Sequence, residues 1–113
     1  MTIREIIEAT NATLATPAQG LSATITQCCV CDLLSWVMAK GTAHAAWITV
    51  QTHLNIVAVA SLLDMPAIIL PDGIAPEENT VAKAAAEGVA LICSPMNAFD
   101  ICAVLARHGI KGV

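Results

Sequence analysis

AWITVQTHLNIVAVASLLDMPAIIL, residues 46–70, is the stretch that decides the fold of this chain. Trp47–Val50 is a short apolar run of the kind that forms strands, and Ala67–Leu70 is a second one. Between them, Leu54–Leu63 is apolar on every side, and its length and alanine content favour a buried helix that Pro66 ends. Two strands joined in this way by a helix form a βαβ unit, in which the strands are parallel.

Polar side chains follow the first of these two strands. In open α/β sheets ligands bind beyond the carboxyl ends of the strands, and parallel neighbours end at the same edge. We therefore expect the loop after each strand to form one wall of a crevice. Backbone amides at the start of the helix between them would favour a small anionic or polar ligand, and a nucleotide-like compound is one candidate. The predicted ligand-binding residues are Gln51, Thr52, His53 and Asn55 on one wall and Asp72 and Gly73 on the other.

A structural alternative for the same segment is helix capping. Thr52 or Asn55 could cap the following helix, with His53 at the surface, and the capping preferences favour this as much as a ligand contact. We expect structural roles for the other two histidines, with His44 in a loop and His108 at a helix C-terminus, where a cation is favourable.

Similar reasoning predicts elements on both sides of the central unit. Thr2 and Glu5 have the spacing of a capping box, Asp32 and Asn97 precede helical patterns, and Gly88 follows one. The predicted helices cover residues 2–9, 33–39, 76–88 and 98–108, and the predicted strands cover 13–15, 22–30 and 89–93.

Strands thus alternate with helices over a single predicted domain, residues 1–113. This alternation predicts the α/β class: a mostly parallel sheet of 4–5 strands with helices on both faces, in a three-layer α/β/α arrangement. Strands buried on both faces also explain the continuous apolar runs.

The composition points to self-association. Hydrophobic residues make up 57% of the chain and charged residues only 12%, against a typical quarter. So few charges leave apolar patches on a small protein, and we expect a homodimer. The net charge of −4 and the scattered cations argue against nucleic acid as a partner. We expect a cytoplasmic protein, because no apolar run is long enough for a membrane span and no signal peptide is recognisable.

Five cysteines, an odd number, argue for free thiols rather than a disulfide framework. Cys28, Cys29 and Cys31 could supply thiolates to a metal. However, adjacent residues of a strand point to opposite faces, which leaves only Cys29 and Cys31 on the same side. We therefore predict buried thiols and no metal site, with a redox or metal role as the alternative.

Signatures of catalysis are missing from the sequence. There is no Gly-x-Ser-x-Gly elbow, no Gly-x-x-x-x-Gly-Lys-Ser/Thr loop and no Gly-x-Gly-x-x-Gly fingerprint. The sequence therefore favours a binding module over an enzyme and predicts no cofactor.

Three segments carry a resemblance to a known family: CDLLSWVM at 31–38, WITVQTHLNIVAVA at 47–60, and AIILPDG at 67–73 with Pro76. They resemble the small stand-alone DRTGG-domain proteins, which are similar to the N-terminal, non-catalytic domain of HPr serine kinase/phosphorylase. The resemblance implies an α/β domain of regulatory type, found elsewhere fused to CBS or phosphotransacetylase domains and encoded near iron-only hydrogenase-like genes. The Asp-Arg-Thr-Gly-Gly motif itself is absent, and Gln51–Asn55 stands in its place.

These observations favour a non-enzymatic regulatory or ligand-sensing module that acts as a homodimer. Two alternatives remain open. One is a small enzyme or phosphate-transfer accessory with its site at residues 51–55, and the other is a redox or metal accessory protein that uses the cysteines.

Overall fold

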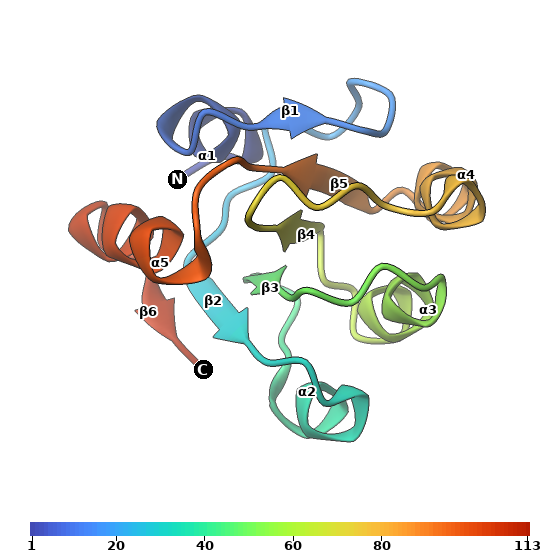
Figure 1. Ribbon diagram of the computed structural model, residues 1–113. Coiled ribbons are helices and arrows are strands. Elements are labelled where there is room, and N and C mark those ends of the chain that lie inside the picture. The colour runs from blue at the N-terminus through green and yellow to red at the C-terminus, as the bar shows by residue number, and fades with distance from the viewer.

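A six-stranded sheet lies between two layers of helices (Figure 1). The computed structural model describes all 113 residues. The predicted α/β class, with a mostly parallel sheet in three layers, is confirmed, but the sheet has six strands and not the predicted four or five. The helices are α1 (Ile3–Ala9), α2 (Leu34–Lys40), α3 (Asn55–Leu62), α4 (Glu78–Glu87) and α5 (Ala98–Arg107). The strands are β1 (Thr13–Leu14), β2 (Gln27–Val30), β3 (Ala45–Ile48), β4 (Ala67–Leu70), β5 (Ala90–Cys93) and β6 (Lys111–Gly112).

The strand order is β1-β5-β4-β3-β2-β6. From β2 to β5 each strand pairs in parallel with the next one along the chain, so the three connections all step in the same direction. Right-handed connections of this kind place their helices on one face, and α2, α3 and α4 do share a face (Figure 1). Helix α5 carries the chain back to β6, beside β2, and lies with α1 on the other face.

Alternate residues of the strands fill two separate cores. Ala46 and Ile48 of β3 face α1 and α5, whereas Trp47 faces α2, α3 and α4. All four residues of β3, and all four of β4, are buried. Burial on both faces is the reason why these strands are continuous apolar runs without an alternating pattern.

Several helix ends follow the predictions. Thr2 Oγ1 accepts a hydrogen bond from the Glu5 amide at 3.2 Å, and the Glu5 carboxylate accepts one from the Thr2 amide at 3.0 Å. Asn97 Oδ1 accepts from the Asp100 amide at 2.8 Å. Gly88 ends α4 with a φ of 72°, a left-handed conformation that glycine adopts without strain. Residues within a few positions of these helix ends are therefore enough to predict where the helices begin or end.

The predicted role of Asp32 as a helix cap is wrong. Helix α2 begins after Leu33 and has no side-chain cap. The Asp32 carboxylate instead accepts hydrogen bonds from Thr49 Oγ1 at 2.8 Å and from the Val50 amide at 3.0 Å. Asp32 therefore ties the exit of β2 to the exit of β3.

Two strands have boundaries that differ from the predicted ones. The strand predicted over 22–30 begins only at Gln27, because the Ala23 and Leu21 carbonyls accept from the first amides of α1. The strand predicted over 47–50 covers Ala45–Ile48. The two-residue strand β6 was not predicted. None of the five helices has the length and apolar character needed to cross a membrane.

Candidate functional site

The loops at the carboxyl edge of the sheet diverge between β4 and β5. The loops after β3 and β4 both lead to helices on the α2–α4 face, whereas the loop after β5 leads to α5 on the opposite face (Figure 1). Two neighbouring loops that leave in opposite directions open a crevice between them, which is where open α/β sheets bind ligands. The topology thus locates the candidate site between β4 and β5.

The largest cavity of the structure lies at this point. Its volume is about 470 Å³. The loop after β4 and the loop after β5 form two sides, and the turn between α1 and β1 closes the third. The lining residues are Asn11, Thr13, Gly73, Ile74, Ala75, Pro76, Cys93, Ser94 and Pro95. The cavity offers apolar contact surface with a few hydroxyl and amide groups, the usual composition of a small-molecule site.

Ser94 holds the three segments around this crevice together. It is fully buried, and its hydroxyl donates to the Thr10 carbonyl at 2.7 Å and accepts from the Met96 amide at 3.1 Å. Its own carbonyl accepts from the Gly73 amide at 2.9 Å. The rim of the crevice is therefore pre-formed by hydrogen bonds and does not depend on a ligand.

Two rim residues adopt the left-handed conformation although they are not glycine. Asn11 has a φ of 53° and Asp72 a φ of 60°. Short polar side chains tolerate this conformation better than others, but it still stores strain. The Asp72 amide donates to the Met96 carbonyl at 2.8 Å, which holds the loop after β4 against the loop after β5.

The predicted site residues are distributed over two places. The expectation that β3 and β4 are parallel neighbours ending at one edge is confirmed. However, Gly73 lines the crevice, while none of Gln51, Thr52, His53 and Asn55 lines any of the four cavities. Gln51 Nε2 points away from β4 and donates to the Asp32 carbonyl at 3.1 Å. Ligand binding by these residues stays a prediction.

Thr52 and His53 make contacts within the fold. The Thr52 carbonyl accepts from Thr80 Oγ1 at 2.7 Å, which links the loop to α4. His53 Nδ1 accepts from the Asn55 amide at 3.2 Å, and the His53 carbonyl accepts from the Ile56 amide. Capping by Thr52 or Asn55, the structural alternative, is wrong, because α3 begins after Leu54 and has no side-chain cap. These contacts also occupy the amides of α3 that an anion would need.

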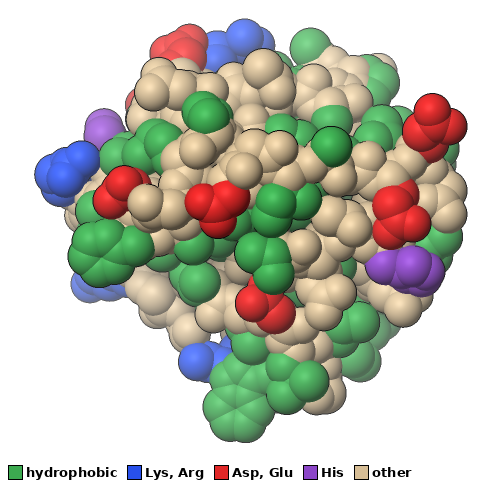
Figure 2. Space-filling model, in the orientation of Figure 1, with side chains coloured by type: hydrophobic (Ala, Val, Ile, Leu, Met, Phe, Trp, Pro, Cys, Tyr) green, Lys and Arg blue, Asp and Glu red, His purple; other side chains and the backbone are tan.

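Lys and Arg side chains are missing from the carboxyl edge of the sheet, whereas acidic side chains lie at both edges. Figures 1 and 2 look onto the carboxyl edge, where acidic side chains are spread over the middle and Lys and Arg side chains lie at the margin. Helices and strands explain the position of the cations, because Arg4, Lys40, Arg107 and Lys111 all lie at helix or strand ends of the amino edge. The acids at the carboxyl edge are Asp32, Asp72, Glu77, Glu78 and Asp100.

The crevice lining itself contains little that could catalyse a reaction. Cys93 is its one ionisable side chain, and burial raises the pKa of this thiol, which makes it a weak nucleophile. No three His, Cys, Asp or Glu side chains of the structure gather in an arrangement that could hold a metal ion.

The cysteines of β2 lie as strand alternation predicts. Cys28 belongs to the core beneath α1 and α5, and Cys29 to the core beneath α2, α3 and α4. Burial raises the pKa of Cys28 to about 12 and raises that of Cys29 as well. All five cysteines are free thiols, and Cys31 is partly exposed. The arrangement is that of small apolar side chains.

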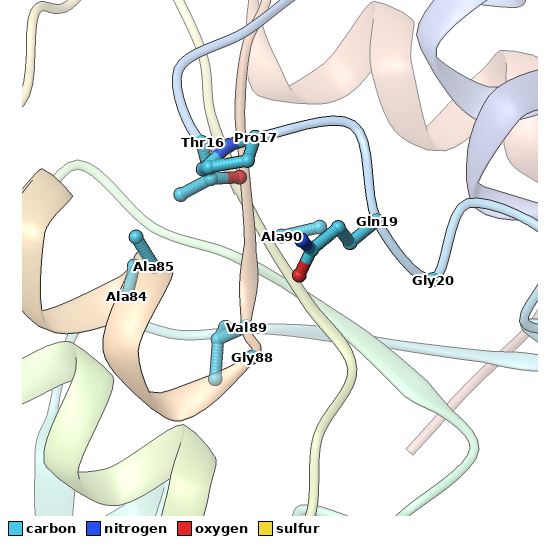
Figure 3. A pocket seen from close by; sticks show the side chains of 9 residues that line it. All are labelled: Thr16, Pro17, Gln19, Gly20, Ala84, Ala85, Gly88, Val89 and Ala90. Carbon is cyan, nitrogen blue, oxygen red and sulfur yellow. The ribbon is translucent and has the colours of Figure 1, made fainter.

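A second cavity, of about 250 Å³, lies at the opposite edge, between the end of α4 and the loop before Leu21 (Figure 3). Figure 3 shows mostly alanine, glycine, valine and proline, with Gln19 and Thr16 as the polar side chains. No ionisable group lines it. We therefore place the candidate site at the carboxyl edge.

Sequence reasoning missed the crevice residues Asn11, Thr13 and Ser94. Asn11 lies in a turn signal between a helix and a strand, and Ser94 follows a strand end, as ligand-binding residues do. Only the strand order reveals which of the strand ends are neighbours across a crevice. That order depends on β6 and β1, the two shortest elements.

Comparison with solved structures gives a similar fold. The chain resembles part of the crystal structure of the CBS and DRTGG domains of the regulatory region of Clostridium perfringens pyrophosphatase complexed with its activator, diadenosine tetraphosphate. The TM-score is 0.78 at 13% sequence identity, over 92% of this chain and 45% of that chain. This chain therefore spans somewhat under half the length of that regulatory region. No family model matches the sequence, and no curated protein matches it either.

Proposed function

We propose that this chain is a regulatory, ligand-sensing domain of the DRTGG type that binds a nucleotide-like small molecule in the crevice between β4 and β5. The observation that carries the proposal is the position of the largest cavity at the point where the loops after β4 and β5 leave for opposite faces. A ligand there would touch α1, α4 and α5 through their connecting loops. Ligand binding would therefore affect helices on both faces of the sheet.

The similar solved structure supports the regulatory part of this proposal. That protein is a regulatory region and holds diadenosine tetraphosphate as activator. The segment resemblance to DRTGG-domain proteins points to the DRTGG part of that region as the counterpart of this chain. We infer from both that a nucleotide-like compound is the first ligand class to test.

The lining of the crevice suggests which part of a nucleotide it would hold. Ile74, Pro76 and Pro95 offer apolar surface to a flat base, and Asn11 and Thr13 offer hydrogen bonds. Phosphate groups would meet the acidic edge, where no Lys or Arg compensates them. Two unit charges 4 Å apart repel by about 1 kcal/mol even in bulk water. We therefore propose that phosphates bind there as a complex with a divalent cation.

The loop Gln51–Asn55 has a secondary place in this proposal. It contacts the start of α4 through Thr52, whose hydroxyl donates to the Glu77 carboxylate at 3.5 Å. Pro76, one residue earlier, lines the crevice. An elongated ligand could extend from the crevice across the start of α4 to this loop, and Asp72 and Gly73 would then form the rim between its two ends.

Calorimetric titration tests the proposal with adenosine, ATP and diadenosine tetraphosphate, each with and without Mg²⁺. We expect Mg²⁺ to strengthen binding of the phosphorylated compounds at least tenfold and to leave adenosine unchanged. Ala75→Leu, which fills the crevice from an exposed position, should weaken binding at least tenfold. Ala86→Leu is the matched control, because Ala86 is an exposed α4 residue outside every cavity.

Other outcomes would redirect the proposal. If Gln51→Ala weakened binding and Ala75→Leu did not, the site would lie at the loop after β3, as the sequence alone predicts. If none of the three compounds bound at millimolar concentration, the nucleotide-like class would be wrong.

A further inference from the structure

One flank of the sheet carries an apolar groove that no part of the chain covers. The groove has a volume of about 160 Å³ and runs between α5 and the β2–β6 edge. Cys28 and Val30 of β2 line one side, and Cys102, Leu105 and Ala106 of α5 line the other. Strand β6 pairs with Gln27 and Cys28, and the Val113 amide continues along this edge by donating to the Cys28 carbonyl at 3.1 Å.

Large apolar side chains on α5, at the end of β2 and at the start of α2 face solvent. Phe99 is 82% exposed and lies three residues before Cys102, hence on the groove side of α5. On the other side of the β2 exit, Leu33 is 62% and Trp36 57% exposed, and Val30 is 52% exposed. Figure 2 shows such uncovered hydrophobic side chains over α5, at the left, and over α2, at the bottom. Single exposed hydrophobic residues are ordinary, but several large ones on one flank are typical of an interaction surface.

The charges along the same flank are self-complementary. Asp32 and Asp100 lie at its carboxyl end, and Arg107 and Lys111 lie at its amino end. All four side chains are exposed. A two-fold axis perpendicular to β2 would bring the acidic end of one copy against the basic end of the other. A parallel arrangement would instead bring like charges together.

We propose that two copies of this chain form a two-fold dimer through this flank, which we call the β2–β6 flank, with their sheet edges antiparallel. An isologous interface needs a surface that complements itself, and the alternation of apolar centre and opposite charges at the two ends provides it. The groove and the four exposed apolar side chains would form the buried centre.

Sedimentation velocity of the full chain tests this at protein concentrations from about 1 to 200 μM. We expect a monomer–dimer equilibrium whose dissociation constant rises at least tenfold in Phe99→Gln and in Trp36→Gln. Leu62→Gln is the matched control, since Leu62 is 68% exposed at the end of α3, away from the flank. It should change the dissociation constant less than twofold.

A charge reversal separates this arrangement from nonspecific association. Arg107→Glu should weaken the dimer at least fivefold at low salt, and the difference from wild type should shrink at 0.5 M NaCl because salt screens the charges. Arg4→Glu, the same change on α1, should leave the dimer unchanged. Far-ultraviolet circular dichroism shows whether each variant is folded.

Two results would overturn the proposal. The first is a wild-type chain that remains monomeric up to 200 μM. The second is a dimer that Leu62→Gln or Arg4→Glu weakens as much as the flank variants do, because the interface would then lie elsewhere.

Discussion

Replacing Ser94 by alanine should lower the free energy of unfolding by about 2 to 3 kcal/mol, a large effect for the loss of one oxygen atom. The Ser94 hydroxyl is fully buried and serves two partners, the Thr10 carbonyl and the Met96 amide. Leaving a buried polar group without a partner costs about 1 to 3 kcal/mol, and the Met96 amide, which is only partly buried, adds less. The missing atom leaves too small a cavity to add a comparable amount.

Urea denaturation measures this change. With a typical slope of about 1 to 2 kcal/mol per molar urea, the midpoint should fall by about 1 to 3 M. Ser61→Ala is the control, because the Ser61 hydroxyl bonds the Glu87 carboxylate at an exposed position, and this change should cost less than about 1 kcal/mol. A shift for Ser94→Ala no larger than that of Ser61→Ala would refute the reasoning that Ser94 holds the crevice together.

Three further predictions concern other parts of the chain. The free energy of unfolding should fall as the pH rises from about 9 towards 12, because the folded state keeps Cys28 protonated up to a pKa of about 12 while the unfolded thiol ionises near 9.0. Urea titrations at pH 8 and pH 10.5 measure this fall, which should be smaller in Cys28→Ala than in the wild type. Gly41→Ala should lower the melting temperature at a cost of about 1 to 3 kcal/mol, since the new Cβ would lie 2.7 Å from Leu63 Cδ1, and an unchanged melting temperature would contradict this. His53→Ala should cost less than about 1 kcal/mol, because the bond from the Asn55 amide to His53 Nδ1 is exposed, and it should speed hydrogen exchange at that amide; unchanged exchange would show that this bond does not protect the amide.

Local signals made most of the fold predictable. The Thr2–Glu5 capping box, the Asn97 cap and the left-handed Gly88 each act within a few residues, so sequence reasoning placed these helix ends correctly. The buried strands β3 and β4 were recognisable because parallel strands need apolar side chains on both faces.

Nonlocal contacts account for what was missed. Lys111 and Gly112 have no strand-like pattern, and they form β6 only because Gln27 and Cys28 offer an open edge. Asp32 stands where a helix cap would, but Thr49 and Val50 on the next strand exit compete successfully for its carboxylate.

The position of the crevice has the same explanation. The sequence indicated that ligands bind beyond strand ends, and it named Gly73, which does line the cavity. It could not show that the chain changes faces after β5, since that follows from α5 returning to β2. The loop after β3 was therefore favoured over the loop after β5.

The strand order also implies an order of folding. Gln27 pairs with Ala45, Ala46 with Ala67 and Ala67 with Ala90, so neighbours in the central sheet are about 20 positions apart. Gln27 and Lys111 are 84 positions apart, and Thr13 and Cys93 are 80. Closing each of the longer loops costs roughly 1 kcal/mol more in chain entropy than closing a loop of the central sheet. Each of these closures forms only two residue pairs.

We therefore expect β2 to β5 to assemble first and the two edge strands to close last and open most readily. The turn before β1 completes the crevice, and β6 completes the β2–β6 flank. Both surfaces that we propose for binding are thus built on the parts of the sheet that fluctuate most, so a ligand or a second copy would slow amide exchange there before it changed the stability of the central strands.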